Sequence, residues 1–262
     1  MTKLMMTGAN GRVGKELREY GVLPLSGDVT NPLDLLDTVL QEKPDIIVHM
    51  ASISDVEFCE RPENQEKVIS TNLVGTVNVL NVAEEVGAKV VLLSTDHVFG
   101  GGVNRTRRGP YLETDTPTPV NFYGCSKFAA EALQEAYDNL YVVRTSYLFD
   151  KKRLGLDTDL CVETYQPDFI YRSFMYLPHF VSNLYMYLSN LSDMPKLMHI
   201  SGSMTVSWYG FMKAIISKVH PRKKEIGLFA PRPYMSGLRT KYNLLPTYSF
   251  LDGINAMMGD KK

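Results

Sequence analysis

The sequence lacks an excess of charge of either sign. Its 262 residues include 28 Lys and Arg against 29 Asp and Glu, which gives a formal net charge of −1 at pH 7. Because no positive field is present to attract a phosphate backbone, nucleic acid is not expected as a partner. The densest basic run, residues 105–108, is interpreted as a solvated loop.

Long apolar runs and paired cysteines are also missing. No run approaches the roughly 20 residues that cross a bilayer, so no membrane partner is expected. A glycine turn at Gly8 comes too early for the apolar region of a signal peptide. The three cysteines, Cys59, Cys125 and Cys161, form neither a CxxC pair nor a disulfide framework, and no metal site is predicted. We therefore expect a cytoplasmic protein in a reducing compartment.

What is present is the composition of an ordinary globular protein. Hydrophobic residues make up 44% of the chain and charged residues 22%, close to the usual shares. The length suits one large α/β domain, or a nucleotide-binding domain with a small substrate lobe.

Short apolar runs alternate with amphipathic stretches through the first half of the chain, a pattern typical of βαβ units. Strands are predicted at residues 3–7, 22–25, 45–50, 89–94 and 140–145, and helices at 12–20, 32–42, 63–86 and 123–137. Asn31 as N-cap and Pro32 in the first helical position mark the start of the second helix. The pattern predicts an α/β fold of the Rossmann type, a doubly wound parallel sheet with helices on both faces.

The pattern changes after Asp150. Residues 1–150 are predicted to form an NAD(P)-binding Rossmann domain, and residues 151–262 a small substrate-binding lobe. Residues 151–177 are irregular, but a predicted helix at 180–188 and a strand at 197–201 indicate that the sheet resumes, before a further helix at 208–219. The lobe is therefore expected to be interleaved with about residues 178–201 of the Rossmann domain.

Three glycines, Gly8, Gly11 and Gly14, follow the first predicted strand at the spacing G-x-x-G-x-x-G. Small residues let backbone N–H groups approach a pyrophosphate, and the helix that follows adds the positive end of its dipole. A glycine triplet by itself is equally compatible with a tight turn that binds nothing. Its position between a first strand and a first helix favours a dinucleotide site.

Asp28 and Arg12 give opposite indications of which dinucleotide binds. An acidic residue about 20 positions after the first glycine contacts the ribose hydroxyls of NAD, and Asp28 stands at that distance from Gly8. Arg12, inside the glycine turn, is expected to reach the 2′-phosphate of NADP. We favour NADP(H) and keep NAD(H) as the alternative.

Tyr123 and Lys127 stand four residues apart at the start of a predicted helix and so share one face. A neighbouring ammonium is expected to lower the pKa of the phenol from about 10 and make it a general acid or base. Thr95 follows an apolar strand, at the edge where parallel sheets bind ligands, and its hydroxyl is expected to hydrogen-bond a substrate carbonyl. Each feature alone is common, but their order after the glycine turn indicates catalysis.

With these features the sequence resembles the extended short-chain dehydrogenase/reductase family, and within it the dTDP-4-dehydrorhamnose reductases. The resemblance runs from residue 3 to about 149 and rests on residues 7–14, 27–31, 43–48, 94–99, 119–124, 126–127 and 144–146. It implies that Thr95, Tyr123 and Lys127 are the catalytic set. It also implies a larger set of cofactor contacts: Gly8, Asn10, Gly11, Arg12, Val13, Gly14, Asp28, Val29, Ala51, Ser52, Ser94, Tyr123 and Lys127. In the family the residue at Asp28 lies at the adenine end, while His49 is interpreted as a core residue and Asn72 as structural.

The reaction that the resemblance implies is hydride transfer from NAD(P)H to the C4 ketone of a nucleotide-linked 4-keto-6-deoxy sugar, with Tyr123 as proton donor. Dehydratases of the family carry an acidic residue where this sequence has His97, which favours reduction over dehydration. Substrate contacts are predicted from Asp96, Ser146, Tyr147 and Arg232, the last with a diphosphate.

Two alternatives to a simple reductase stay open. One is a non-catalytic NADP-binding regulatory subunit, and the other is a sugar-nucleotide epimerase or epimerase/reductase. The resemblance is compatible with a homodimer, and the sequence specifies neither the nucleotide nor the sugar.

Overall fold

The computed structural model describes residues 2–100, 110–154, 164–216, 219–222 and 231–259. Six parallel strands form one sheet in the order β2, β1, β3, β4, β5, β10. Their bounds are Leu4–Thr7 (β1), Leu23–Pro24 (β2), Ile46–His49 (β3), Lys89–Thr95 (β4), Leu140–Thr145 (β5) and Leu197–His199 (β10). The strand order reverses its direction between β1 and β3, which is where such sheets bind ligands. The predicted Rossmann-type fold is confirmed.

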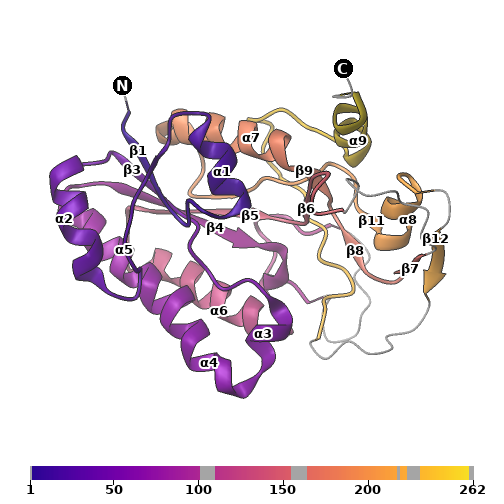
Figure 1. Cartoon of the computed structure of the whole chain (residues 1–262), viewed down its shortest axis with the longest axis horizontal. Helices are drawn as coiled ribbons and strands as arrows, with labels where there is room; N and C mark the ends of the chain where they lie inside the picture. The colour runs from indigo at the N-terminus through magenta and orange to yellow at the C-terminus, as the bar shows by residue number, and fades with distance from the viewer. Residues whose placement is uncertain (1, 101–109, 155–163, 217–218, 223–230, 260–262) are drawn as a thin grey trace.

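Helices cover both faces of the sheet (Figure 1). On one face lie α1 (Arg12–Arg18) and α7 (Leu177–Ser189), whose buried Leu17, Phe180 and Leu184 pack against the sheet. On the other face lie α2 (Pro32–Glu42), α5 (Gly75–Glu84) and α6 (Phe122–Glu131), which bury a second apolar cluster. Buried on both faces, the central strands consist of nearly continuous apolar residues, as parallel strands require.

A smaller lobe stands at the carboxyl ends of the strands (Figure 1). Its described residues form three two-stranded pairs, β6 (Leu148–Phe149) with β9 (Met175–Tyr176), β8 (Tyr171–Arg172) with β11 (Val206–Ser207), and β7 (Thr164–Pro167) with β12 (Val219–Arg222). The helices α8 (Trp208–Lys213) and α9 (Phe250–Gly259) complete it. Its core is aromatic, since Phe174 stacks on Phe211 with ring centroids 4.0 Å apart. The strand β10 belongs to the six-stranded sheet and α7 packs against it, although strands of the lobe precede and follow them in the chain. The predicted division at residue 150 stays a prediction.

Three predicted helices are wrong in extent. The helix expected at 123–137 ends as α6 at Glu131 and is followed by a 3-10 turn (Ala132–Glu135). The helix expected at 63–86 is divided into α4 (Pro62–Ile69), a π-helical turn (Ser70–Val74) and α5, and it is preceded by the short α3 (Val56–Glu60). The π-turn positions Asn72 inward, where its side chain bonds Ile53 and Ser126, contacts that helical periodicity does not reveal. The helix expected at 208–219 ends at Lys213, and Val219 begins β12 because that segment pairs with β7. The basic run 105–108 and Cys161 lie outside the described residues.

Candidate active site

Two cavities adjoin the carboxyl ends of the sheet strands and share Gly8 and Gly11. The first cavity, of about 580 Å³, lies between the glycine turn and the end of β2. The second cavity, of about 800 Å³, runs from the glycine turn past the ends of β4 and β5 to the lobe. Among the predicted cofactor residues, Asn10, Asp28, Val29 and Ala51 line the first cavity, and Arg12, Val13, Gly14, Ser52 and Ser94 line the second.

The three glycines of the turn are needed for different reasons. Gly8 has a φ of +70°, and a Cβ there would lie 2.7 Å from the backbone N of Ala51. A Cβ on Gly14 would lie 2.7 Å from Cα of Ala9, so this glycine lets α1 pack closely on the strand–helix turn. Gly11 is the least crowded, because a Cβ would meet only the carbonyl oxygen of Gly8, at 3.2 Å. Close packing therefore favours glycine at all three positions, most strictly at Gly8 and Gly14, and Gly11 also borders both cavities.

A buried histidine supports the turn from below. The Thr7 hydroxyl accepts hydrogen bonds from the backbone N–H groups of Met50 and Ala51, so its own proton faces Nδ1 of His49, 2.7 Å away. The other ring nitrogen of His49 lies 3.1 Å from the Thr76 hydroxyl. Burial lowers the pKa of His49 to about 3, so the ring is neutral. These contacts agree with the interpretation of His49 as a core residue.

Thr95 and Tyr123 face each other across the wall of the second cavity, from the end of β4 and the first turn of α6. The two side chains are hydrogen-bonded, and Thr95 also accepts a bond from the His97 backbone N–H at 3.2 Å. Lys127 lies one turn further along α6 and is only 1% exposed. The structure thus brings Thr95 and Tyr123 together at the second cavity, whereas Lys127 lines neither cavity and its catalytic role stays a prediction.

The pKa of Tyr123 is raised, whereas the Tyr–Lys spacing led us to expect a lowered value. Burial raises the pKa of Tyr123 well above its ordinary value, although the hydrogen bond with Thr95 opposes the shift. Burial also lowers the pKa of Lys127 to about 8, against the attraction of Glu131 one turn further along the helix. The phenol is therefore protonated at neutral pH.

Glu131 belongs to a buried ionic cluster behind Lys127. Arg144, on β5, donates hydrogen bonds to both of its carboxylate oxygens, at 2.7 to 3.1 Å, and the Ser94 hydroxyl donates another. All three side chains are at most 5% exposed. This cluster ties β4 and β5 to α6, and it occupies the hydroxyl of Ser94, which was predicted to contact the cofactor.

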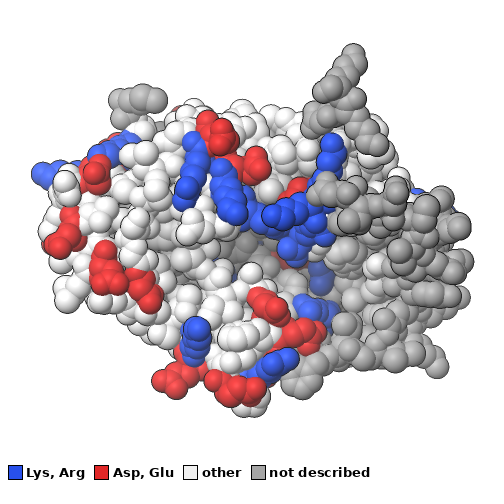
Figure 2. Space-filling model, viewed as in Figure 1, with Lys and Arg blue, Asp and Glu red and all other residues white. Residues whose placement is uncertain are grey.

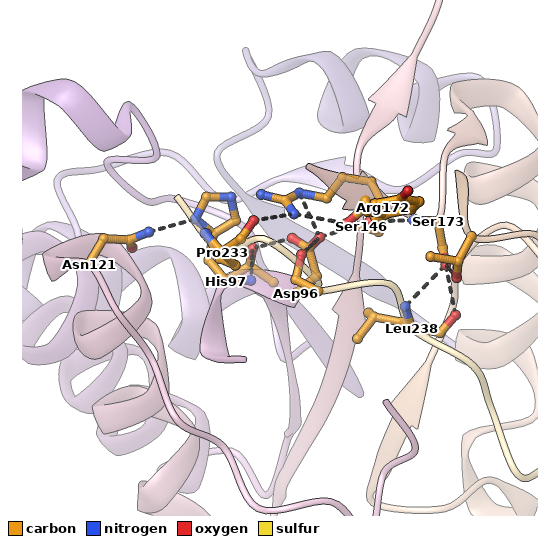
Figure 3. Close-up of polar contacts among 12 residues, drawn as sticks. Asp96, His97, Asn121, Ser146, Arg172, Ser173, Pro233 and Leu238 are labelled. Carbon is orange, nitrogen blue, oxygen red and sulfur yellow. Dashed lines mark hydrogen bonds and ion pairs between the residues drawn. The ribbon is translucent and has the colours of Figure 1, made fainter. Parts of the chain in front are cut away.

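Asp96 is the centre of a network that joins the sheet to the lobe (Figure 3). Its carboxylate accepts hydrogen bonds from Ser146 at 2.9 Å and Ser236 at 2.6 Å, and it pairs with Arg172 at 3.3 Å. Ser146 in turn accepts a bond from the Ser173 backbone N–H at 3.2 Å. Asp96 and Ser146 border the second cavity but are occupied by protein partners, so their contact with substrate stays a prediction.

Arg172 is a residue of the second cavity that the sequence pattern does not indicate. Its guanidinium is almost fully buried, lines the second cavity, and donates to the carbonyl oxygens of Tyr171 and Pro233, both at 3.0 Å. It lies in the stretch that shows no periodicity, and its only sequence signal is a lone charge within an aromatic run, Phe169 to Phe174. A buried charge requires a partner, which Asp96 supplies from a distant part of the chain.

Three further arginines border the second cavity. Arg12 pairs with Asp150 at 3.0 Å, and Arg232 pairs with Glu57 at 3.0 Å. Arg153 lies over the ring of Tyr147 and bonds its hydroxyl at 2.7 Å. Burial is the largest cause of the lowered pKa values of Arg12 and Arg172. The positive charge of Arg153 lowers the pKa of Arg12 further, and Arg232 acts on Arg172 in the same way, so positive charges lie close together around this cavity. Such clustering is typical of a site for an anion.

The structure separates Arg12 from the first cavity. Asp28 lines that cavity, whereas Arg12 lines only the second and is held by Asp150 and the carbonyl oxygen of Leu148. The predicted reach of Arg12 to a 2′-phosphate stays a prediction. Asp28 directs one carboxylate oxygen to the backbone N–H and hydroxyl of Thr30, both at 2.9 Å.

The described residues contain no group of three or more His, Cys, Asp or Glu placed to hold a metal ion. None of the helices in this described part is both long enough and apolar enough to span a bilayer.

Comparisons with known proteins agree with this geometry. The family described as "RmlD substrate binding domain" matches residues 1–164. A dTDP-4-dehydrorhamnose reductase of Burkholderia thailandensis is 37% identical over 156 residues, 56% of this chain and 50% of the relative. The spore coat polysaccharide biosynthesis protein SpsK of Bacillus subtilis is 29% identical over 258 residues, 91% of this chain and 89% of the relative.

Solved structures extend the likeness to the whole chain. The structure of dTDP-4-dehydrorhamnose reductase from Bacillus anthracis in complex with NADP has a TM-score of 0.87 and 28% identity, with 100% of both chains covered. The sequence matches to the reductases, by contrast, span about half the length of those relatives. The resemblance predicted from the sequence is confirmed, and the chain belongs to the RmlD substrate binding domain family.

Proposed function

We propose that this protein is an NADPH-dependent reductase of a nucleotide-linked 4-keto-6-deoxy sugar, similar to dTDP-4-dehydrorhamnose reductase. The observation that carries the proposal is the second cavity, which has the glycine turn at one end and Thr95 and Tyr123 in its wall. The names of the relatives and the NADP in the Bacillus anthracis structure support the same reaction and cofactor.

The residues of the two cavities fit a dinucleotide. Gly8 and Gly11 border both cavities, so an extended ligand could cross the turn from one cavity to the other. The first cavity, beside Asp28 and Val29, would hold the adenosine end, and the second the nicotinamide end. When bound, the cofactor would supply the hydride for reduction of the ketone.

The chain's own residues would handle the proton. Thr95 would hold the carbonyl oxygen by a hydrogen bond, which polarises the ketone. Tyr123 keeps its proton because burial raises its pKa, and it would release that proton from Oη to the much more basic alkoxide oxygen. The Lys127 ammonium, one turn away, would then stabilise the phenolate.

His97 disfavours dehydration. Burial lowers its pKa to about 4, and the Asn121 side-chain amide lies 3.0 Å from its Nδ1. Because an amide N–H donates, Nδ1 accepts and the ring is neutral. The position therefore lacks the carboxylate that a dehydratase would use as a base.

The arginines of the second cavity favour an anionic substrate. Arg172 and Arg232 approach from the lobe side, so a diphosphate placed between them would relieve the repulsion of their charges. Tyr147 presents an aromatic ring in the same wall, next to Trp208 with ring centroids 4.6 Å apart. An aromatic surface beside a cationic one suits a nucleoside diphosphate.

The test is to follow nicotinamide absorbance after NADPH or NADH is added with dTDP-, UDP- and GDP-linked 4-keto-6-deoxy sugars. The proposal predicts oxidation of NADPH with at least one of them. Tight NADPH binding without oxidation of any of these substrates would contradict it and favour a regulatory subunit. A product epimerised at C3 or C5 would indicate an epimerase/reductase. A homodimer and a cytoplasmic location are part of the proposal and are checked by light scattering and by cell fractionation.

A further inference from the structure

The first cavity has one cationic and one acidic side chain among the residues that line it, Arg18 and Asp28. Arg18 is in the last turn of α1 and is exposed. In Figure 2, basic side chains lie over the region of α1 and along the upper edge of the central hollow. The basic residue that borders the adenosine end of the proposed cofactor site is thus Arg18, whereas Arg12 borders the second cavity.

Arg18 keeps most of its hydrogen-bonding capacity for a ligand. Its Nη2 donates to the side-chain oxygen of Asn10, 3.2 Å away, and no carboxylate of the described residues forms an ion pair with it. A guanidinium has five donors in a planar fork. The contact with Asn10 therefore anchors the guanidinium at the cavity wall and leaves donors of the fork for an anion.

Asp28 uses one of its carboxylate oxygens within its own loop. Hydrogen bonds from Thr30 lower its pKa, so it is charged, but they also turn one of its oxygens toward Thr30. An acid that bound both ribose hydroxyls would favour NAD and repel a 2′-phosphate. Ser26 and Asn10 line the same cavity and add polar groups that suit phosphate oxygens.

We propose that Arg18, together with Asn10 and Ser26, forms a subsite for a phosphate monoester on the 2′-position of the adenosine ribose. This subsite makes the protein prefer NADPH to NADH. The inference rests on the proposed function only in assigning the adenosine end of the dinucleotide to the first cavity. Arginine suits this role because its fork binds phosphate oxygens in pairs.

The experiment measures dissociation constants by the fluorescence of bound NADPH and NADH, and by calorimetry with 2′,5′-ADP and 5′-ADP. Arg18→Gln is expected to weaken NADPH and 2′,5′-ADP by roughly 10- to 100-fold, the usual effect of losing hydrogen bonds to a charged group. NADH and 5′-ADP are expected to keep their affinity within about twofold, because neither carries the 2′-phosphate. Thermal unfolding of the variant checks that it folds.

Two control variants test whether a general positive charge suffices. Lys15→Gln removes a charge from the same helix, and Lys67→Gln removes one that acts on Asp28; neither lysine lines the first cavity. Both are expected to leave the NADPH:NADH preference unchanged.

Equal weakening of NADPH and NADH in Arg18→Gln would overturn the inference, as would no weakening of either. A shift of preference as large in Lys15→Gln or Lys67→Gln would also overturn it. This experiment measures binding and not turnover. If the wild-type protein oxidises NADPH with none of the sugars, the proposed reaction is contradicted, while the binding data still decide whether Arg18 holds the 2′-phosphate.

Discussion

Replacing Asp96 by Asn removes the counter-charge of a guanidinium that the fold has buried. Asp96 and Arg172 are both only 5% exposed as side chains, and the carboxylate also accepts bonds from Ser146 and Ser236. Breaking a buried pair from one side costs about 3–5 kcal/mol, because the remaining charge keeps its desolvation penalty. For a chain of this size Tm falls by about 2 °C per kcal/mol, so the loss lowers Tm by roughly 6–10 °C.

Urea unfolding followed by fluorescence measures the effect, and a second substitution isolates its cause. In Asp96→Asn/Arg172→Met, no unpaired charge remains, so the double variant is expected to recover at least half of the lost stability. The exposed Asp138, which pairs with Lys196 at 3.3 Å, provides the matched control, and Asp138→Asn is expected to show no measurable change. If Asp96→Asn loses less than about 1 kcal/mol, the pair does not hold the lobe to the sheet in the way inferred here.

Three further predictions concern packing and protonation. Gly14→Ala is expected to cost about 1–3 kcal/mol in urea unfolding, since its Cβ would lie 2.7 Å from Cα of Ala9; an unchanged midpoint would show that the turn yields freely. Phe211→Ala is expected to cost about 3–5 kcal/mol because the ring is fully buried against Phe174, and a loss below about 1 kcal/mol would contradict a tightly packed lobe core. The rate of NADPH oxidation is expected to fall as pH rises through about 8, because Lys127 loses its proton there. In Lys127→Arg the decline is expected at higher pH, because a guanidinium keeps its proton. A rate that stays constant up to pH 10 would exclude a role for the ammonium. The lowered pKa of Lys127 also makes the free energy of unfolding depend on pH. Between about pH 8 and 10.5 the unfolded chain holds the proton that the folded chain has lost, so the contribution of this lysine to stability rises with pH.

Features encoded by local sequence were predictable. The glycine turn, the five strands of the first half and the helix at Pro32–Glu42 follow from residue spacing, and each lies within a few residues of its expected bounds. The approach of Thr95 to Tyr123 also followed, because Thr95 ends β4 at the carboxyl edge of the sheet and the crossover helix α6 begins at that edge.

Features that depend on distant contacts were not predictable. The pKa of Tyr123 is raised, not lowered, because its sign depends on burial that the Tyr–Lys spacing does not report. Arg172 reaches Asp96 only because the lobe packs against the sheet in the folded chain, and no local sequence pattern indicates that pair. The two cavities divide Arg12 from Arg18, although both follow the same glycine turn.

The division of helix 63–86 has a similar origin. Its apolar periodicity continues across the π-turn, while the turn itself is associated with Asn72, whose amide bonds Ile53 and Ser126. A Cβ on Gly75 would lie 2.8 Å from Val29, so close packing against the loop after β2 also requires a small residue there. Both constraints come from other elements of the fold.

Tyr123→Phe removes the hydroxyl that is proposed to donate the proton in the ketone reduction. The substitution removes only the hydroxyl, so NADPH is expected to bind with unchanged affinity. The turnover number with the best nucleotide-linked 4-keto-6-deoxy sugar is expected to fall by about 10²- to 10⁴-fold, the usual contribution of a general acid. Wild-type turnover by Tyr123→Phe, with the variant folded and NADPH bound, would contradict the claim.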